Sequence, residues 1–210
     1  ALGLTGLPAW LGIPVLLLAG SLSGGLMAGT SGVLLRYLRT DELISSFLLS
    51  AAAIPIVDYL IQGPLKDAGS NLLATPEIPA AFRFASWLPP SRLSAGILIA
   101  VGLVGLSYFV MYRTLPGYEL RLTGLNREFA HYGGIPVGTY TIVPMLVSGA
   151  FSGLAGAVAV LGSQFAAFVG QSGGLGWNGI AVALIARNHP ALVLPAALAF
   201  AFLRAGAQSA

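Results

Sequence analysis

The residues whose types and spacing could carry out chemistry lie between Gly170 and His189. The run from Gly170 to Gly174 has the GxSxG pattern that surrounds the nucleophile of many serine hydrolases, and its base would have to be His189. Residues 177–186 are apolar and predict a helix, whose ends lie about 15 Å apart at 1.5 Å per residue. A nucleophile and its base must come within about 3 Å. The spacing therefore argues against an intramembrane serine protease with Ser172 as its nucleophile.

Other catalytic patterns fail for similar reasons. Residues 174–179 match GxGxxG, but a dinucleotide site needs a preceding strand and a later acidic residue, and the last acidic residue is Glu128. The single lysine, Lys66, lies in the run LKDAG, which is not a phosphate-binding loop. The two histidines and seven acidic residues show no metal-ligand spacing, and cysteine is absent. We expect no catalytic site, metal or cofactor in this chain.

The composition indicates an integral membrane protein. The chain has 210 residues, of which 56% are hydrophobic and 8% are charged, whereas soluble domains carry about 25% charged residues. Its 28 glycines suit membrane helices that pack closely. No run of Lys and Arg is present of the kind that follows nucleic-acid phosphates, so we expect no nucleic-acid partner. The predicted fold class is all-α, a polytopic bundle of transmembrane helices.

A spanning helix needs about 20 apolar residues, and the hydropathy pattern predicts five spans within a single membrane domain. The first is too long for one straight span, so we expect tilt or a break in the run GSLSGG at 20–25. Thr40 is the expected N-cap of the second span. The expected spans are about 7–35, 42–61, 93–112, 140–162 and 177–206, the last with a break near 187–190.

Two stretches between the spans are not typical of lipid-facing helices. Residues 63–92 are polar and rich in proline and predict an external loop, with a short amphipathic piece around 80–87 and Trp87 at the interface. Asp58 lies just before it, and we expect its carboxylate to reach external water rather than act within the membrane. Residues 163–179 are polar and glycine-rich. They predict a broken or re-entrant segment, because such backbone must be buried or face a cavity.

A polar island at residues 117–135 lies between two long apolar runs. It holds Glu119, Arg121, Arg127 and Glu128, in a chain with only ten basic and seven acidic residues. Basic residues favour the cytoplasmic side of a membrane, so we expect residues 113–136 to form a cytoplasmic loop with a helix that a soluble partner binds. The same rule places Arg36, Arg39 and Arg187 inside, whereas Lys66, Arg83 and Arg92 lie in the external loop, so the rule is obeyed only in part.

Four stretches, in order, resemble the permease subunits of ABC importers, and most of all the bacterial branch for nucleosides and simple sugars. They are DELISSFLLS with YLIQGPLKD, RTLPGYELRLTGLNREFAHYGGI, MLVSGAFSGLAGAVAVLG, and GWNGIAVALIARNHP. The resemblance implies import by alternating access in the bacterial cytoplasmic (inner) membrane. It also implies ATP-binding subunits that hold ATP and magnesium, a second permease subunit, identical or related, and an extracytoplasmic substrate-binding lipoprotein. The family has more spans, so we expect this chain to be part of a longer sequence.

The resemblance assigns roles to two sets of residues. One set would form a coupling helix in a groove of the ATP-binding subunit, with Arg121 and Arg127 pairing with acids of the partner. Gly124 and Asn126 would let the backbone of this segment turn. Phe129 stands where the family tends to have a small residue, and Ser50 where relatives often carry Asn. The coupling set is Gly117, Glu119, Arg121, Gly124, Asn126, Arg127, Phe129, Ala130, Gly134 and Ile135, and the candidates for the substrate pathway are Ser46, Ser50, Ser148, Gln164, Trp177 and Asn178.

Several alternatives stay open at this point. The transported solute could be another small polar molecule, such as a branched-chain amino acid. Trp177 and Asn178 suit a nucleoside, because an indole stacks on a base and an amide bonds to its edge. Helix packing explains the serines equally well. A passive channel without an ATP-binding partner, or the intramembrane serine protease, would belong to a different class of protein.

Overall fold

The computed structural model describes residues 9–38, 40–67, 69, 72–85 and 94–209. Within these ranges the chain is helical, and its one β-pairing is an isolated bridge between Ala74 and Phe168. Five helices are long and apolar enough to cross a membrane: Trp10–Leu38, Glu42–Gln62, Gly96–Arg113, Val137–Gln164 and Pro190–Ala207. The expected all-α fold with several spans is therefore confirmed. The residues Arg39, Trp87 and Arg92 of the sequence analysis lie outside the described ranges.

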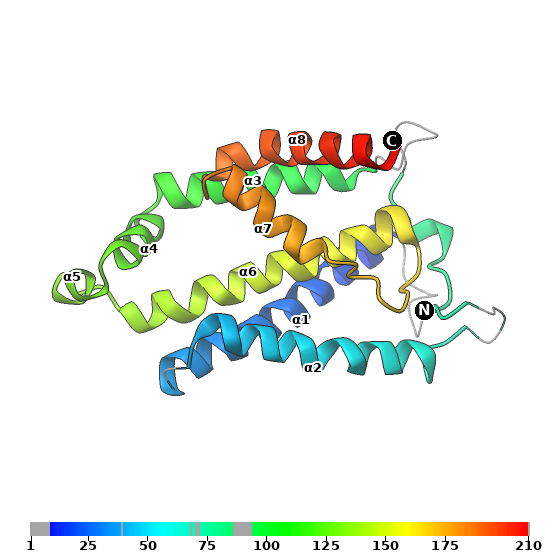
Figure 1. The fold of residues 1–210 in the computed structure, drawn as a ribbon, viewed down its shortest axis with the longest axis horizontal. Helices are drawn as coiled ribbons and strands as arrows, with labels where there is room; N and C mark the ends of the chain where they lie inside the picture. The colour runs from blue at the N-terminus through cyan, green and yellow to red at the C-terminus, as the bar shows by residue number, and fades with distance from the viewer. Residues whose placement is uncertain (1–8, 39, 68, 70–71, 86–93, 210) are drawn as a thin grey trace. The chain divides into compact units, whose positions relative to one another are not determined.

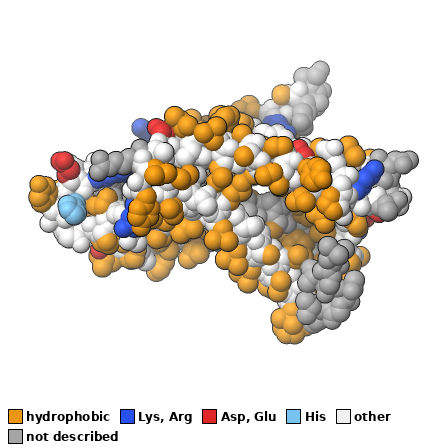
Figure 2. All heavy atoms as spheres, turned by 90° about the horizontal axis from the view of Figure 1, so that it is seen from below, with side chains coloured by type: hydrophobic (Ala, Val, Ile, Leu, Met, Phe, Trp, Pro, Cys, Tyr) orange, Lys and Arg blue, Asp and Glu red, His pale blue; other side chains and the backbone are white. Residues whose placement is uncertain are grey.

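The chain divides into two compact units, whose helices are labelled in Figure 1. The first unit contains α1 (Ala9–Leu38), α2 (Glu42–Gln62) and α6 (Val137–Ala159). The second contains α3 (Gly96–Arg113), α4 (Leu115–Leu125), α5 (Arg127–Tyr132), α7 (Leu175–Ile185) and α8 (Pro190–Ser209). Hydrophobic side chains cover much of the surface in Figure 2, as expected for helices whose solvent is lipid.

Helices α1 and α6 pack backbone against backbone along a glycine seam. A Cβ atom built on Gly24 would lie 2.8 Å from Gly153 Cα, and one built on Gly153 would overlap the carbonyl oxygen of Gly20. Small residues permit this approach, which stabilises helix pairs in membranes through close packing. Helix α1 runs unbroken through residues 20–25, so of the tilt or break expected there, the break is absent.

The start of α2 differs from the expectation by one residue. Asp41, not Thr40, is the N-cap, and its Oδ1 accepts the N–H groups of Leu43 (2.8 Å) and Ile44 (3.2 Å). Both residue types cap helices well. The carboxylate of Asp41 has the added advantage of a negative charge at the positive end of the helix dipole.

The fourth span ends in a π-helical turn, η2 (Val160–Gln164), which Phe165 closes in the left-handed region with φ 57°. The backbone after this turn is not helical until α7 begins, which agrees with the broken segment expected there. The loop that follows α2 supplies hydrogen-bond partners for backbone groups of this segment and of the π-helical turn. The N–H of Thr75 donates to the carbonyl of Ala167 (3.0 Å), and that of Phe84 donates to Leu161 (2.9 Å). The described part of the expected external loop therefore covers the broken segment.

Side chains reinforce this cover. Arg83 donates from Nε to the carbonyl of Ile78 (2.9 Å), pairs with Glu77 (2.7 Å), and lies 4.6 Å above the ring of Phe165. The short helix η1 (Ala80–Phe82) buries Phe82, whose ring packs against Gly12 of α1. Of the piece expected to be amphipathic, the described residues 80–85 contain one helical turn, which the ring of Phe82 anchors.

We predict that Gly153→Ala destabilises the protein by about 1–3 kcal/mol, because the added methyl overpacks the α1–α6 seam. The measurement is thermal unfolding of the detergent-solubilised protein. Gly156→Ala is the matched control, since a Cβ built on Gly156 meets nothing within 4 Å. Equal melting temperatures for the two variants would contradict the prediction.

Candidate functional site

The candidate site is the α4–α5 segment, which connects a helix of the second unit to α6. Its first part is fixed to the end of α3. Thr114 donates from Oγ1 to the carbonyl of Val110 (2.6 Å) and caps α4 by accepting the N–H of Gly117 (3.4 Å). Gly117 is buried, and a Cβ built on it would overlap the carbonyl oxygen of Val110. Glycine is therefore needed here for the two helices to meet at an angle.

Asn126 separates α4 from α5. Its backbone is extended (φ −156°, ψ 108°), its N–H still bonds to Leu122 (3.0 Å), and its Oδ1 accepts the N–H of Phe129 (3.0 Å). One residue thus ends one helix and caps the next, as expected for Asn at an N-cap. Gly124, which was also expected to turn the backbone, instead lies inside α4.

The end of α5 folds back on itself at Gly134, whose φ of +80° favours glycine. The N–H of Ile135 then donates to the carbonyl of Ala130 (3.0 Å). As a result Ala130 is completely buried and Ile135 nearly so. This corrects the expectation that Ala130 touches a partner, because no part of it is accessible.

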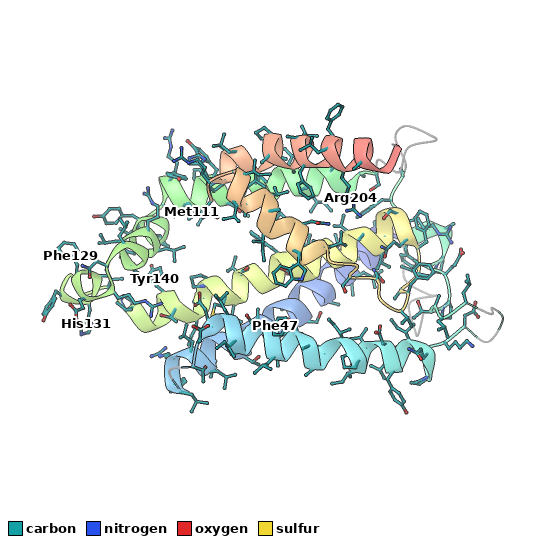
Figure 3. All side chains as sticks on the ribbon, viewed as in Figure 1. Phe47, Met111, Phe129, His131, Tyr140 and Arg204 are labelled. Carbon is teal, nitrogen blue, oxygen red and sulfur yellow. The ribbon has the colours of Figure 1, made fainter. Side chains whose placement is uncertain are left out.

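The accessible surface of the segment includes three large apolar or aromatic side chains beside its charged ones. Leu125 is 84% exposed, Phe129 61% and Tyr132 89%. Phe129 and His131 project from the tip of the segment in Figure 3. Sequence reasoning identified Phe129 but missed Leu125 and Tyr132. The available signal was that large apolar side chains within a polar stretch are either buried within the chain or contacted by another protein.

The charged residues of the segment divide into two groups. Arg127 and Glu128 are exposed in the first turn of α5. Arg121 is engaged within the chain: its Nε donates to the carbonyl of Gly117 (3.4 Å), and its guanidinium carbon lies 4.8 Å from the centre of the Tyr112 ring. Arg121 is exposed and also has contacts within the chain, and its pairing with an acid of a partner stays a prediction. Glu119 is half-buried, and its carbonyl accepts the hydroxyl of Thr123 (2.8 Å).

The candidates for the substrate pathway are spread over both units. In the first unit, Ser46 and Ser50 lie on α2 and Ser148 lies on α6. The hydroxyl of Ser46 donates to the carbonyl of Leu43 (3.2 Å), which is how a serine is satisfied in a membrane helix. In the second unit, Trp177 is 69% exposed and Asn178 is half-buried on α7. Neither unit by itself contains all the candidates.

Gln164 and Asp58 mark the broken segment of the first unit. Gln164 is the last residue of the π-helical turn, and its buried Oε1 has no hydrogen-bond partner in the described part of the chain. Asp58 of α2 accepts the N–H of Gly170 at its Oδ1 (3.2 Å). Asp58 is half-exposed, so the carboxylate that was expected to face water also holds the segment onto α2.

The catalytic patterns of the sequence gain no support from the geometry. The 11 residues of α7 separate Ser172 from His189, a distance of about 16 Å along the helix. The ring of His189 packs instead against Tyr108 and Tyr112. Among the described residues no group of His, Cys, Asp and Glu could hold a metal ion.

The comparisons with known proteins point to transport. The family described as "Branched-chain amino acid transport system / permease component" matches residues 1–210. The probable riboflavin import permease protein RfuC of Treponema pallidum is 35% identical over 190 residues, which cover 89% of this chain and 49% of that protein. The guanosine ABC transporter permease protein NupP of Bacillus subtilis is 31% identical, over 95% of this chain and 58% of that protein.

A third relative shows a similar degree of identity. The glucose ABC transporter permease protein TsgB13 of Haloferax volcanii is 32% identical, over 97% of this chain and 56% of that protein. The chain thus spans about half the length of the curated relatives it matches. No solved structure matches it.

We predict that Asn126→Ala loosens α5, because the N–H of Phe129 loses its acceptor. Loss of an N-cap costs about 1 kcal/mol, so the amide hydrogens of α5 should exchange about fivefold faster. Hydrogen exchange followed by mass spectrometry measures this. Asn126→Asp keeps the acceptor and should exchange like the unchanged protein. An exchange rate in Asn126→Ala equal to that of the unchanged protein would show that the cap does not hold α5.

Proposed function

We propose that this chain, which belongs to the branched-chain amino acid transport system permease family, is part of the membrane-spanning subunit of an ATP-driven ABC importer. Its five apolar helices make it a multi-pass membrane protein. ATP and magnesium would bind to separate ATP-binding subunits, and the transport pathway would form with a second permease subunit. An extracytoplasmic substrate-binding lipoprotein would deliver the solute to the permease. The complex would lie in the bacterial cytoplasmic membrane.

The observation that carries the proposal is that three large side chains of the α4–α5 segment, Leu125, Phe129 and Tyr132, are exposed. This segment lies outside all five candidate spans. Large apolar side chains that protrude from a polar segment mark a protein-binding site, and aromatic residues carry much of the binding energy at such sites. Arg127 and Glu128 beside them would set the orientation of the partner through charge.

The way the segment is held suits the transmission of force. At its start the buried Gly117 and the cap at Thr114 tie α4 to the end of α3. At its end the turn through Gly134 leads directly into α6. A partner that moved the segment would therefore act on two spanning helices, which is a plausible input for alternating access by rigid-body motion.

The proposed solute is a nucleoside or a simple sugar. The names of three relatives specify riboflavin, guanosine and glucose, which all carry polar hydroxyl groups. The exposed indole of Trp177 next to the amide of Asn178 supports a ring-bearing solute, because stacking and amide hydrogen bonds recognise such molecules. A branched-chain amino acid is the competing class, suggested by the description of the family.

Uptake competition tests the class of solute. The full-length permease would be reconstituted in vesicles with its ATP-binding subunits and binding protein. We expect unlabelled guanosine or glucose, and not leucine, to reduce ATP-dependent uptake of the labelled solute. Competition by leucine alone would overturn the proposed class, and uptake without ATP would favour a passive channel.

We predict that Gly124→Arg reduces uptake about tenfold or more, since a large cation would stand where the partner docks. Folding should be unaffected, because Gly124 is exposed and a Cβ built on it meets nothing within 4 Å. Size-exclusion chromatography checks folding, and co-purification checks the binding of the ATP-binding subunit. Gly124→Ser is the matched control with a small side chain. Normal uptake in Gly124→Arg would contradict docking at this position.

A further inference from the structure

An aromatic cluster in the second unit takes no part in the roles considered so far. The rings of Tyr108 and Tyr112, one turn apart on α3, lie 5.1 Å apart. The imidazole of His189 lies 5.2 Å from Tyr112 and 6.1 Å from Tyr108. Figure 3 labels Met111, the residue before Tyr112, near the end of α3. The cluster thus connects the end of one spanning helix to the residue that precedes α8.

Tyr112 has a second neighbour. The guanidinium carbon of Arg121, on α4, lies 4.8 Å from the centre of the Tyr112 ring, which is within the range of a cation–π contact. Tyr112 therefore contacts both the segment proposed to bind the ATP-binding subunit and the turn between α7 and α8. These three side chains, Arg121, Tyr112 and His189, form what we call the Tyr112 stack.

Both ends of the stack are fixed to the backbone around them. Arg121 bonds through Nε to the carbonyl of Gly117, one turn back on the same helix. His189 lies in a tight turn in which its own N–H donates to the carbonyl of Ala186 (3.0 Å). The two residues before it, Arg187 and Asn188, have positive φ values of 52° and 57°. Few residues other than glycine adopt this conformation, so the turn has a defined shape.

The imidazole of His189 depends on the tyrosines for its position. Its buried Nδ1 has no hydrogen-bond partner in the part of the chain that the structure describes. A histidine without a hydrogen bond at a buried nitrogen is held by packing, here against two aromatic rings. A displacement of Tyr112 would therefore move the His189 ring, and with it the turn that joins α7 to α8.

We propose that Tyr112 is a positioning residue that transmits movement of α4 to the α7–α8 turn. The proposal deepens the function given above and rests on it, since it assumes that a partner moves the α4–α5 segment. Helix α7 carries Trp177 and Asn178, so the stack links the docking segment to candidate solute contacts inside one unit. The ring of Tyr112 makes the link, and its hydroxyl is not required.

The first experiment compares uptake with ATP hydrolysis in the complete reconstituted complex. Tyr112→Leu should lower uptake about fivefold or more, the scale expected for loss of one cation–π and one aromatic contact. ATP hydrolysis stimulated by the binding protein should stay within about twofold, because the docking face is intact. Tyr112→Phe should restore uptake. The control is Tyr59→Leu on α2. This variant also loses an exposed tyrosine ring, but Tyr59 belongs to the first unit and is not part of the Tyr112 stack.

Unchanged uptake in Tyr112→Leu would overturn the proposal. A parallel fall of both activities would also overturn it, because Tyr112 would then support folding or docking only. Failure of Tyr112→Phe to restore uptake would show that the hydroxyl, not the ring, is what matters. If the unchanged complex neither took up solute nor hydrolysed ATP, the proposed function itself would fail.

A second experiment decides on the stack without any transport. Hydrogen exchange would be measured on the full-length permease in detergent for the unchanged protein and for Arg121→Leu. We expect faster exchange at Asn188 and His189, whose N–H groups bond to Ala183 and Ala186, and no change along α2. Unchanged exchange in the α7–α8 turn would show that α4 and this turn are not coupled. This result is independent of whether the complex imports anything.

Discussion

The structure depends most on one constraint, that backbone N–H and C=O groups away from water must find partners within the chain. A continuous α-helix meets it by itself, as α1 does over 30 residues. The fourth span does not, because its π-helical turn ends at Phe165 and the backbone then leaves helical geometry. The loop after α2 supplies the missing partners, for example at Ala167 and Leu161. The polar, proline-rich composition of that loop suits this role, since prolines keep it extended and available for pairing.

Glycine serves a different purpose, which is close packing at the places where helices touch. Along the α1–α6 seam and at Gly117 the absence of a side chain lets one backbone lie directly on another. The two cases have different consequences. The seam joins two spanning helices into one rigid pair, whereas Gly117 fixes the angle at which a segment outside the spans leaves α3. The close contact at Gly117 leaves no room for a side chain between α4 and the end of α3.

Sequence reasoning reached the fold through local signals and missed features that depend on tertiary contact. Apolar runs of spanning length indicated five spans, and Asn126 indicated a helix boundary, because both signals are local. The pairing of Thr75 with Ala167 joins residues far apart in sequence and carries no periodic pattern. The burial of Ala130 follows from the fold-back at Gly134, which the sequence of the segment does not reveal. Thr40 and Asp41 are both good caps, and only the geometry distinguishes them.

The division into units gives the α4–α5 segment its significance. In sequence the segment leads directly into α6, yet by its contacts it belongs with α3, α7 and α8. A partner bound to Leu125, Phe129 and Tyr132 would therefore act first on the unit that carries Trp177 and Asn178. The chain passes between the two units at 96–97, 135–136 and 171–172, and the connection at Ile135 and Pro136 lies at the end of this segment. Proline restricts that connection, because its φ is fixed and it has no N–H to donate. The α4–α5 segment is thus grouped with one unit and continues in sequence into the other through Pro136.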